Sequence, residues 1–199
     1  MIPSDLAIIL LASGLSKRFG TEDKLLANLN GRPLGSYAAS HFAAQRTELH
    51  CAIVPAGDEQ RAELYRTHGW HILTNPDPEL GQGNSLSIAA KHLQSSRASG
   101  ALILLADMPF VTKDDLGALI GATPENHASM SQCGETLHPP AIFPRSAFPQ
   151  LTACTGDTGA RHVFRQLSQT TICPISSRSA RDIDTPLALA KAQESQLHA

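Results

Sequence analysis

The chain has 199 residues, of which 42% are hydrophobic and 17% charged, and its formal net charge is -2. This length and composition indicate one globular domain with a substantial core, and they exclude disordered and fibrous proteins. The near-neutral charge excludes the broad cationic surface that binding to nucleic acid or to an anionic membrane would require. Any phosphate site must therefore be built locally, from backbone N–H groups and a few cations.

The cysteines and the start of the chain bear on its compartment. Cys51, Cys133, Cys154 and Cys173 are far apart and form no C-x-x-C pair. This predicts free thiols in a reducing cytosol rather than a zinc site or a disulfide framework. The apolar run 8–11 follows no basic leader and is too short to cross a bilayer. We therefore expect a buried strand at this point and a cytoplasmic protein that does not contact membranes.

Short apolar runs alternate with helical patterns along the chain. Strands are predicted at 6–11, 49–54, 70–74, 101–105, 128–133, 137–143 and 170–175. Helices are predicted at 34–45, 58–66, 86–93 and 158–167. Thr112 and Asp115 predict a capping box for a helix that carries Leu116, Leu119 and Ile120 on one face. Thr185-Pro186 is typical of the start of a last helix.

This alternation predicts an α/β fold, a three-layer α/β/α sandwich with a mostly parallel sheet. The sequence contains no repeat, low-complexity tract or linker, so we expect residues 1–199 to form a single domain. Ligands of such sheets lie beyond the carboxyl ends of the strands. The loops after the first, third and fourth predicted strands leave from this edge, so the site is expected there.

The loop after the first strand combines small residues with cations. It reads L-A-S-G-L-S-K-R-F-G from Leu11 to Gly20, and Lys24 follows. Small residues let the backbone approach a ligand, and successive N–H groups can then hold phosphate oxygens. Arg18 would add a bidentate hydrogen-bond donor to phosphate, and Lys24 would add a single positive charge. The loop matches neither the Walker motif nor the dinucleotide fingerprint, and an ordinary loop with solvated cations is the alternative.

This run resembles the signature L-A-x-G-x-S-x-R-[MF]-G…K of the molybdenum cofactor nucleotidyltransferases, which belong to the nucleotide-diphospho-sugar transferase superfamily. The resemblance extends over nearly the full chain and is nearest to the cytidylyltransferase-like branch. It implies a Rossmann-like fold and a Mg²⁺-dependent transfer of a nucleoside monophosphate from an NTP to molybdopterin. It also implies that Gly14, Ser16, Arg18 and Lys24 lie against the triphosphate. The residues expected beside the nucleotide on the preceding stretch are Leu11, Ala12 and Ser13, the last two near the base.

The segment G-Q-G-N-S-L-S at 81–87 resembles the G-x-x-x-S-[LI] segment of the family. The resemblance implies that Gly83 and Ser85 help to seat the base and ribose, while Asn84 stands where a serine is common. The structural alternative is that Asn84 or Ser85 caps the helix that follows.

Asp107 is a lone carboxylate at the end of the most apolar predicted strand. Such a group is costly to bury unpaired, so a cation is a natural partner, and Mg²⁺ takes one or two carboxylates together with substrate phosphates. The alternative is an aspartate that caps the turn. By resemblance, Asp107 is the metal-binding aspartate of the family. The run D-I-D-T-P at 182–186 likewise implies a second metal contact from Asp184, with Asp182 as the other choice. The alternative is that Asp184 lies near the start of the last helix because the helix dipole favours a negative charge there.

Two downstream motifs resemble the acceptor-facing part of the family. H-P-P-A-I-F at 138–143 resembles G-[HN]-P-x-x-[FL], with Leu137 in place of glycine, and 156–161 matches G-D-x-G-A-R. The resemblance implies that the C-terminal half binds the acceptor and the N-terminal half the NTP. The acceptor residues so implied are His138, Pro139, Gly156, Asp157, Gly159 and Arg161. The alternatives are a structural His138 and a local ion pair between Asp157 and Arg161.

The resemblance assigns catalysis to Lys24, Arg18 and Asp107, which would act by positioning and charge neutralisation. Ser13 stands where the guanylyltransferase branch has glycine, which favours CTP. The alternatives are a guanylyltransferase of the same family and a non-catalytic protein that binds and delivers molybdenum cofactor. An NAD-binding or flavodoxin-like domain is disfavoured by the missing fingerprint. A molybdoenzyme recipient is a further candidate partner.

Overall fold

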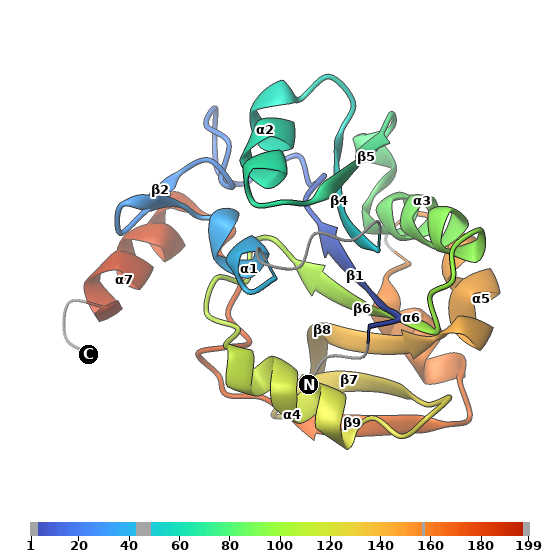
Figure 1. Ribbon diagram of the computed structural model, residues 1–199. Coiled ribbons are helices and arrows are strands. Elements are labelled where there is room, and N and C mark those ends of the chain that lie inside the picture. The colour runs from blue at the N-terminus through green and yellow to red at the C-terminus, as the bar shows by residue number, and fades with distance from the viewer. Residues whose placement is uncertain (1–3, 43–48, 157, 197–199) are drawn as a thin grey trace.

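The computed structural model describes residues 4–42, 49–156 and 158–196 (Figure 1). Within these residues, seven strands form one sheet in the order β5-β4-β1-β6-β8-β7-β9. β8 runs antiparallel to both of its neighbours and all the other pairs are parallel, so the expectation of a mostly parallel sheet is confirmed. The strands are β1 (Leu6–Leu11), β4 (His50–Pro55), β5 (His71–Asn75), β6 (Gly100–Leu105), β7 (Ala128–Cys133), β8 (Thr136–Pro144) and β9 (Thr170–Pro174).

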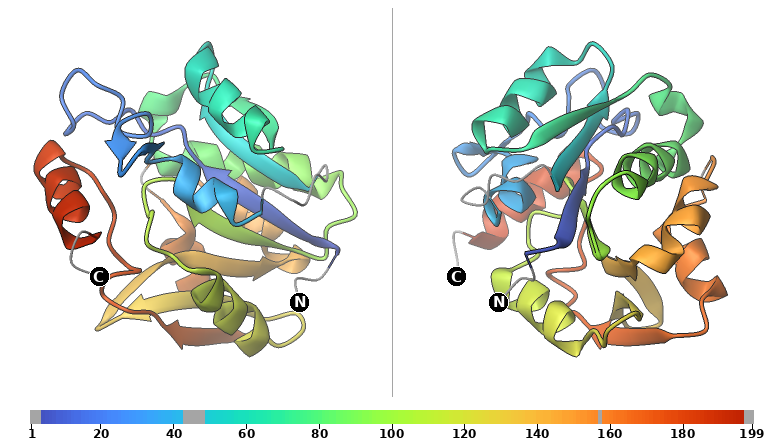
Figure 2. Two further views of the ribbon diagram at one scale, coloured as in Figure 1. Left: turned by 60° about the vertical axis from the view of Figure 1, so that its left-hand side comes forward. Right: turned by 45° about the vertical axis from the view of Figure 1, so that its right-hand side comes forward.

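Helices cover both faces of this sheet, which gives the three expected layers (Figure 2). One face carries α1 (Ser36–Ser40), α2 (Glu59–Thr67) and α4 (Lys113–Ala122), and the other carries α3 (Gln82–Gln94), α5 (Phe148–Thr152) and α6 (Ala160–Gln166). The short 3₁₀ helices η1 (Pro78–Leu80) and η2 (Arg145–Ala147) lie in the connections. The last helix, α7 (Pro186–Gln196), contacts a separate hairpin of β2 (Asn28–Leu29) and β3 (Arg32–Pro33).

The centre of the core is β1, whose six residues are all buried. Leu6, Ile8 and Leu10 pack into the cluster beneath α1, α2 and α4, whereas Ala7 and Ile9 pack into the cluster beneath α3, α5 and α6. A strand buried on both faces reads as a continuous apolar run, because successive side chains point to opposite sides of the sheet. The apolar run of the sequence therefore identified the central strand.

The predicted strands and most of the predicted helices are confirmed, with three differences. Helix α1 begins at Ser36 rather than at 34, and the predicted stretch 43–45 lies outside the described residues. The hairpin of β2 and β3 was not predicted, although its turn, Asn30-Gly31, is a hairpin signal in which both residues have positive φ (50° and 85°). Helix α5 is a further element that the sequence pattern did not indicate.

Two helix starts test the capping predictions. At α4, Thr112 and Asp115 form the predicted capping box, with each side chain bound to the other residue's backbone N–H. At α3, neither Asn84 nor Ser85 caps the helix, so that alternative was wrong. Gly81 (φ 88°) is the N-cap residue and contributes no side-chain hydrogen bond. The Asn84 side chain instead donates to Asn75 Oδ1 and to the Asp77 carbonyl. The side chain of Asn84, in the first turn of α3, therefore contacts the loop after β5 instead of capping its own helix.

The strand order places three loops at one edge of the sheet. From β1 the chain moves outward through β4 to β5, then crosses back to β6 on the other side of β1. Ligands of open α/β sheets bind where the order reverses in this way. The four cysteines are free, and none of the described helices is long and apolar enough to span a membrane.

Helix α3 packs directly on the segment before α6. A side chain at Gly83 would place its Cβ 2.7–2.8 Å from the backbone atoms of Thr155, and the Gly83 amide donates to the Gly156 carbonyl at 2.8 Å. Real Cβ atoms do not approach backbone so closely, so only glycine fits at 83. The segment expected to bind the nucleotide therefore touches the segment expected to bind the acceptor.

We predict that Gly83→Ala lowers the free energy of unfolding by roughly 1–3 kcal/mol, because the added methyl forces α3 away from Thr155. The matched control is Gly117→Ala on the exposed face of α4, where a Cβ meets nothing within 4 Å. That change should stabilise the protein by up to about 1 kcal/mol, since alanine is the better helix former. Urea unfolding of both variants measures the two effects, and equal shifts would contradict the close contact at Gly83.

Candidate active site

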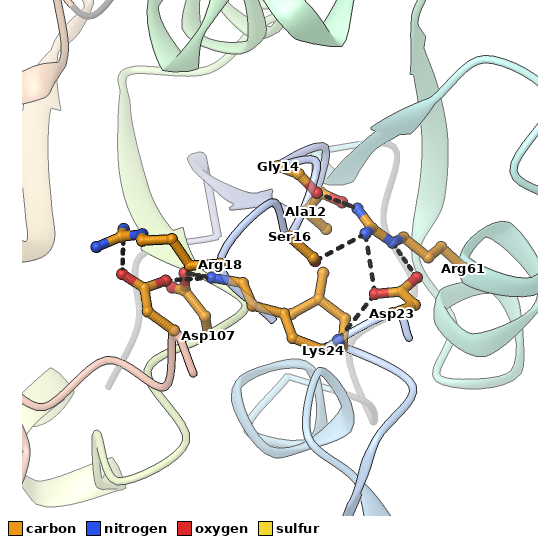
Figure 3. Close-up of polar contacts among 10 residues, drawn as sticks. Ala12, Gly14, Ser16, Arg18, Asp23, Lys24, Arg61 and Asp107 are labelled. Atoms are coloured by element: carbon orange, nitrogen blue, oxygen red, sulfur yellow. Dashed lines mark hydrogen bonds and ion pairs between the residues drawn. The ribbon is translucent and has the colours of Figure 1, made fainter. Parts of the chain in front are cut away.

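Two carboxylates and one lysine meet beyond the carboxyl ends of β1 and β6 (Figure 3). Lys24 Nζ lies 2.6 Å from Asp107 Oδ2 and 2.6 Å from Asp184 Oδ1. Asp107 follows β6, and Asp184 comes from the segment before α7. That segment is held in place by the buried Ile183, whose amide donates to the Asp107 carbonyl at 2.9 Å. The structure thus brings together the lysine and both of the predicted metal-binding aspartates.

Burial and charge compete at this cluster. The Lys24 side chain is 9% exposed, and burial alone would lower its pKa. The charge and hydrogen bond of Asp107, followed by those of Asp184, outweigh burial and raise the pKa of Lys24 above its ordinary value. The pKa of Asp182 is also raised, first by burial and then by the carboxylates of Asp184 and Asp107. Lys24 therefore stays positively charged, and the carboxylates around it make a further negative charge at Asp182 unfavourable.

Arg18 joins the cluster from the solvent side. Its Nη2 donates to Asp184 Oδ2 at 2.5 Å, while 74% of its side chain is exposed. Arg18 and Asp184 both line two adjacent cavities. One cavity, of about 390 Å³, is lined by Lys24 and Asp107 and by residues of the second half of the chain. The other, of about 350 Å³, is lined by Leu15 and Ser16 on the first loop and by the segment 78–81. The cation–carboxylate cluster thus stands where the two cavities meet.

A buried polar network holds the first loop to α3. Ser13 Oγ lies 2.5 Å from Ser85 Oγ, and Asn75 Nδ2 donates to both hydroxyl oxygens at 3.1 and 3.2 Å. Asn75 is fully buried, and its own oxygen accepts from the Asp77 amide and from Asn84 Nδ2. The hydroxyls of Ser13 and Ser85, both expected beside the nucleotide, face each other, and Ser13 lines neither of the two cavities. The sequence analysis did not identify Asn75, whose signal was a polar residue at the end of a strand.

Arg61 is the second residue that the sequence analysis missed. It lies on α2 with its side chain 4% exposed, and its guanidinium binds the carbonyls of Ala12 and Gly14 and the carboxylate of Asp23. In Figure 3 it approaches the first loop from the side opposite to Asp107. No pattern in the first loop points to a partner at position 61, and Arg61 also interrupts the apolar spacing of its helix. A charged residue at an otherwise apolar position of the helix was the signal available in the sequence.

The acceptor residues expected from the sequence gather on the larger cavity in part. His138, Pro139 and Arg161 line it, together with Gln82 on α3. Gly159 lies against Gln82, whose Oε1 would be 2.7 Å from a Cβ at that position. Gly156 has φ +56° and contacts Gly83 as described. Asp157 lies outside the described residues, and with it the alternative of an ion pair to Arg161.

The donor set fits Mg²⁺ on one point of geometry. Asp107 Oδ1 is buried and has no hydrogen-bond partner, while its other oxygen binds Lys24. An unpaired buried carboxylate oxygen is costly, and a cation would satisfy it. In the described part of the chain, no three His, Cys, Asp or Glu side chains group closely enough to hold a metal by themselves. Asp107 and Asp184 therefore suit an ion that takes most of its ligands from phosphates and water.

Comparison with known proteins bears on this arrangement. Residues 8–171 match the family described as "MobA-like NTP transferase domain". The chain belongs to this family.

Among the relatives of this MobA-like chain, the purine catabolism protein PucB of Bacillus subtilis is 33% identical over 190 residues, which cover 89% of this chain and 91% of that protein. A probable molybdenum cofactor guanylyltransferase of Rhodopirellula baltica is 27% identical over 195 residues, covering 92% and 90%. A nucleotidyl transferase from Methanothermobacter has the same fold, with a TM-score of 0.80 at 15% identity over 98% and 99% of the two chains. So does a manganese complex of Rv0371c from Mycobacterium tuberculosis, with a TM-score of 0.70 at 18% identity over 96% and 100%.

We predict that Lys24→Met lowers the free energy of unfolding of this MobA-like chain by roughly 1–3 kcal/mol, because two partly buried carboxylates lose their shared cation. Lys17→Met is the matched control, since Lys17 is an exposed lysine of the same loop and should leave stability within about 0.5 kcal/mol. Urea unfolding at pH 7 checks both. Equal stability of the native protein and Lys24→Met would show that the two ion pairs contribute nothing.

Proposed function

We propose that this MobA-like chain transfers a nucleoside monophosphate, with CMP favoured, from an NTP to molybdopterin or molybdenum cofactor. The observation that carries the proposal is that Asp184 lines both of two adjacent cavities and binds Lys24, which lines the larger cavity beside Asp107. One cavity is lined mainly by the first loop and the segment before α3, and the other largely by the second half of the chain. Two substrates that must react with each other require two sites that share one charged boundary.

In the proposed reaction, an oxygen of the acceptor phosphate attacks the α-phosphorus of the NTP. The bond between that phosphorus and the oxygen bridging to the β-phosphate breaks, and pyrophosphate leaves with this oxygen. The attacking oxygen is already anionic, so the step needs no strong general base. The work left to the protein is to align two anions and to offset their repulsion. Lys24 and Arg18 are the cations placed to do so.

Asp107 and Asp184 would hold Mg²⁺ in this reaction, and Asp182 is the other carboxylate close by. The chemistry that the ion would supply is positive charge that offsets the charge of the phosphates. Lys24 binds both carboxylates, and its ammonium group would offset phosphate charge of the NTP from that position. Gly14 and Ser16 of the first loop would supply backbone contacts to the triphosphate.

The acceptor would occupy the larger cavity. His138, Pro139 and Arg161 line its wall, and Gly156 and Gly159, which have no side chains, would let a ligand come close to their backbone. The exposed Arg161 can bind phosphate with two parallel hydrogen bonds, which suits a phosphorylated acceptor. This division assigns the N-terminal half to the NTP and the C-terminal half to the acceptor.

The preference for CTP rests on Ser13. Its hydroxyl binds Ser85 on α3, which draws the first loop and the helix together at the place where the base would enter. A narrower entrance favours the smaller pyrimidine ring.

A guanylyltransferase is the second candidate, and the specific observation for it is the name of the Rhodopirellula baltica relative. A non-catalytic delivery protein is the third candidate. A carrier would have no need for Lys24, Arg18 and Asp107 together, so the joint presence of these groups around one boundary supports catalysis over delivery.

We expect CTP to be preferred over GTP by roughly 10- to 200-fold in kcat/KM, the range that one small group in a pocket supplies. The measurement is pyrophosphate release with each of the four NTPs, Mg²⁺ and molybdopterin. Ser13→Gly should relax the preference, whereas Asp107→Asn should remove most activity with every NTP. A preference for GTP would overturn the base assignment and leave the transfer reaction standing. No pyrophosphate release with any NTP would overturn the reaction itself.

We expect Arg161→Ala to raise the KM for the acceptor at least tenfold while the Kd of the NTP, measured by calorimetry, stays within about twofold. The physical reason is the loss of a bidentate phosphate contact on the acceptor side only. Arg165→Ala on the same helix is the control, because Arg165 is exposed and lines neither of the two cavities. A collapse of NTP affinity in Arg161→Ala would mean that the motif serves the other substrate.

A further inference from the structure

Arg61 is a buried cation that the proposed reaction does not use. Its side chain is 4% exposed, although it is the third residue of α2 on the protein surface. Nε and Nη2 bind the two oxygens of Asp23 at 2.6 and 2.9 Å, which is a bidentate pair. Nη1 binds the carbonyl oxygens of Ala12 and Gly14 at 2.7 and 2.8 Å. A single guanidinium therefore binds the start of the first loop, at Ala12 and Gly14, and its end, at Asp23.

These contacts fix the direction of the loop amides. In a planar trans peptide, the N–H of each residue points opposite to the C=O of the residue before it. Because the carbonyls of Ala12 and Gly14 point at Arg61, the amides of Ser13 and Leu15 point away from it. Among the described residues, none accepts a hydrogen bond from the amides at 13–16. Leu15 and Ser16 line the cavity of about 350 Å³, so the free amides of these two residues belong to the segment that faces it, whereas Ser13 is buried beside it.

The same guanidinium also places Lys24. Asp23, its bidentate partner, is the preceding residue, and Asp23 Oδ1 in addition accepts from the Leu25 amide at 2.9 Å. Arg61 is itself anchored from its own helix by Asp58, whose carboxylate lies 3.2 Å from Nε. The chain of contacts therefore runs from α2 through Arg61 to the residues on both sides of the loop, 12–16 and 23–25 (Figure 3).

We propose that Arg61 is a positioning residue for the triphosphate. It turns the loop amides towards the NTP cavity and holds Lys24 between the two carboxylates, without touching either substrate. The inference rests on the proposed NTP site, but not on the identity of the base or of the acceptor. Arginine is required because a lysine ammonium group cannot bind two carbonyls and both oxygens of a carboxylate in one plane.

The test compares Arg61→Lys with Arg66→Lys. Arg66 lies on the same helix, pairs with Glu59 and Glu63 and contacts no residue of the first loop among the described pairs. Arg61→Lys should raise the Kd for Mg²⁺-NTP at least tenfold and lower kcat/KM by about 100-fold, the cost of misplacing reacting groups by about 1 Å. The KM for the acceptor should stay within about twofold. Hydrogen exchange at the hydrogen-bonded loop amides of Phe19 and Leu25 should become faster, while exchange in β1 and β6 stays as in the native protein. Arg66→Lys should change none of these quantities.

Asp23→Asn is the second variant, because it keeps the size of Arg61's partner and removes its charge. It should shift the Kd for the NTP and the loop exchange in the same direction by a smaller factor, including where Arg61→Lys fails to fold. Native values of both quantities in Arg61→Lys would overturn the proposal, as would faster exchange throughout the protein, which indicates a structural role only. If the native chain bound no NTP, the proposed function would fail, and exchange at the Phe19 and Leu25 amides would still decide whether Arg61 orders the loop.

Discussion

The pairing of β1 with β4 on one side and β6 on the other is the constraint on which the site depends. All six residues of β1 are buried, and its last residue, Leu11, lies level with Ile53 and Leu105. The backbone bonds continue past the strands, from the Ala12 amide to Ile53 and from the Ala106 amide to Leu11. The starts of the first loop and of the Asp107 turn are therefore fixed relative to each other by hydrogen bonds in the interior. Slippage by one residue would turn Asp107 to the other face of the sheet.

Around this rigid edge of the sheet, charged side chains pair with opposite charges close by instead of forming a broad charged surface. Lys24 neutralises two carboxylates, Arg61 is neutralised by Asp23 and Asp58, and Arg18 pairs with Asp184. Each cation is placed by a carboxylate that is itself placed by backbone. On the proposed function, this local balance would let a chain of net charge -2 bind two anionic substrates. The cations are few, but burial and hydrogen bonds hold them where the phosphates would converge.

The sequence predicted the sheet well because strands such as β1 and β6 are apolar on both faces, and a continuous apolar run is a strong local signal. It also predicted that Asp107 and Lys24 share one edge, since the loops after parallel strands leave from the same side. The roles of Asn75 and Arg61 could not be predicted, because each depends on contacts across 10 to 62 positions of chain that no local spacing encodes. The hairpin at Asn30-Gly31 is different, since its turn signal was present and outweighed by the expectation of a single long loop. The side chain of Ser13 was expected at the base, whereas its hydroxyl is bound within the protein.

The contact between Gly83 and the backbone of Thr155 and Gly156 also limits how the chain can diversify. A protein whose two halves serve different substrates invites recombination, in which one half is exchanged for that of a relative with another acceptor. In this chain the two halves meet where the backbone of Gly83 contacts the backbone of Thr155 and Gly156, so a change of side chain cannot compensate for a mismatch there. A chimera of this chain keeps the contact if the first turn of α3 and the segment before α6 come from the same parent, or if both parents have glycine at the position of Gly83.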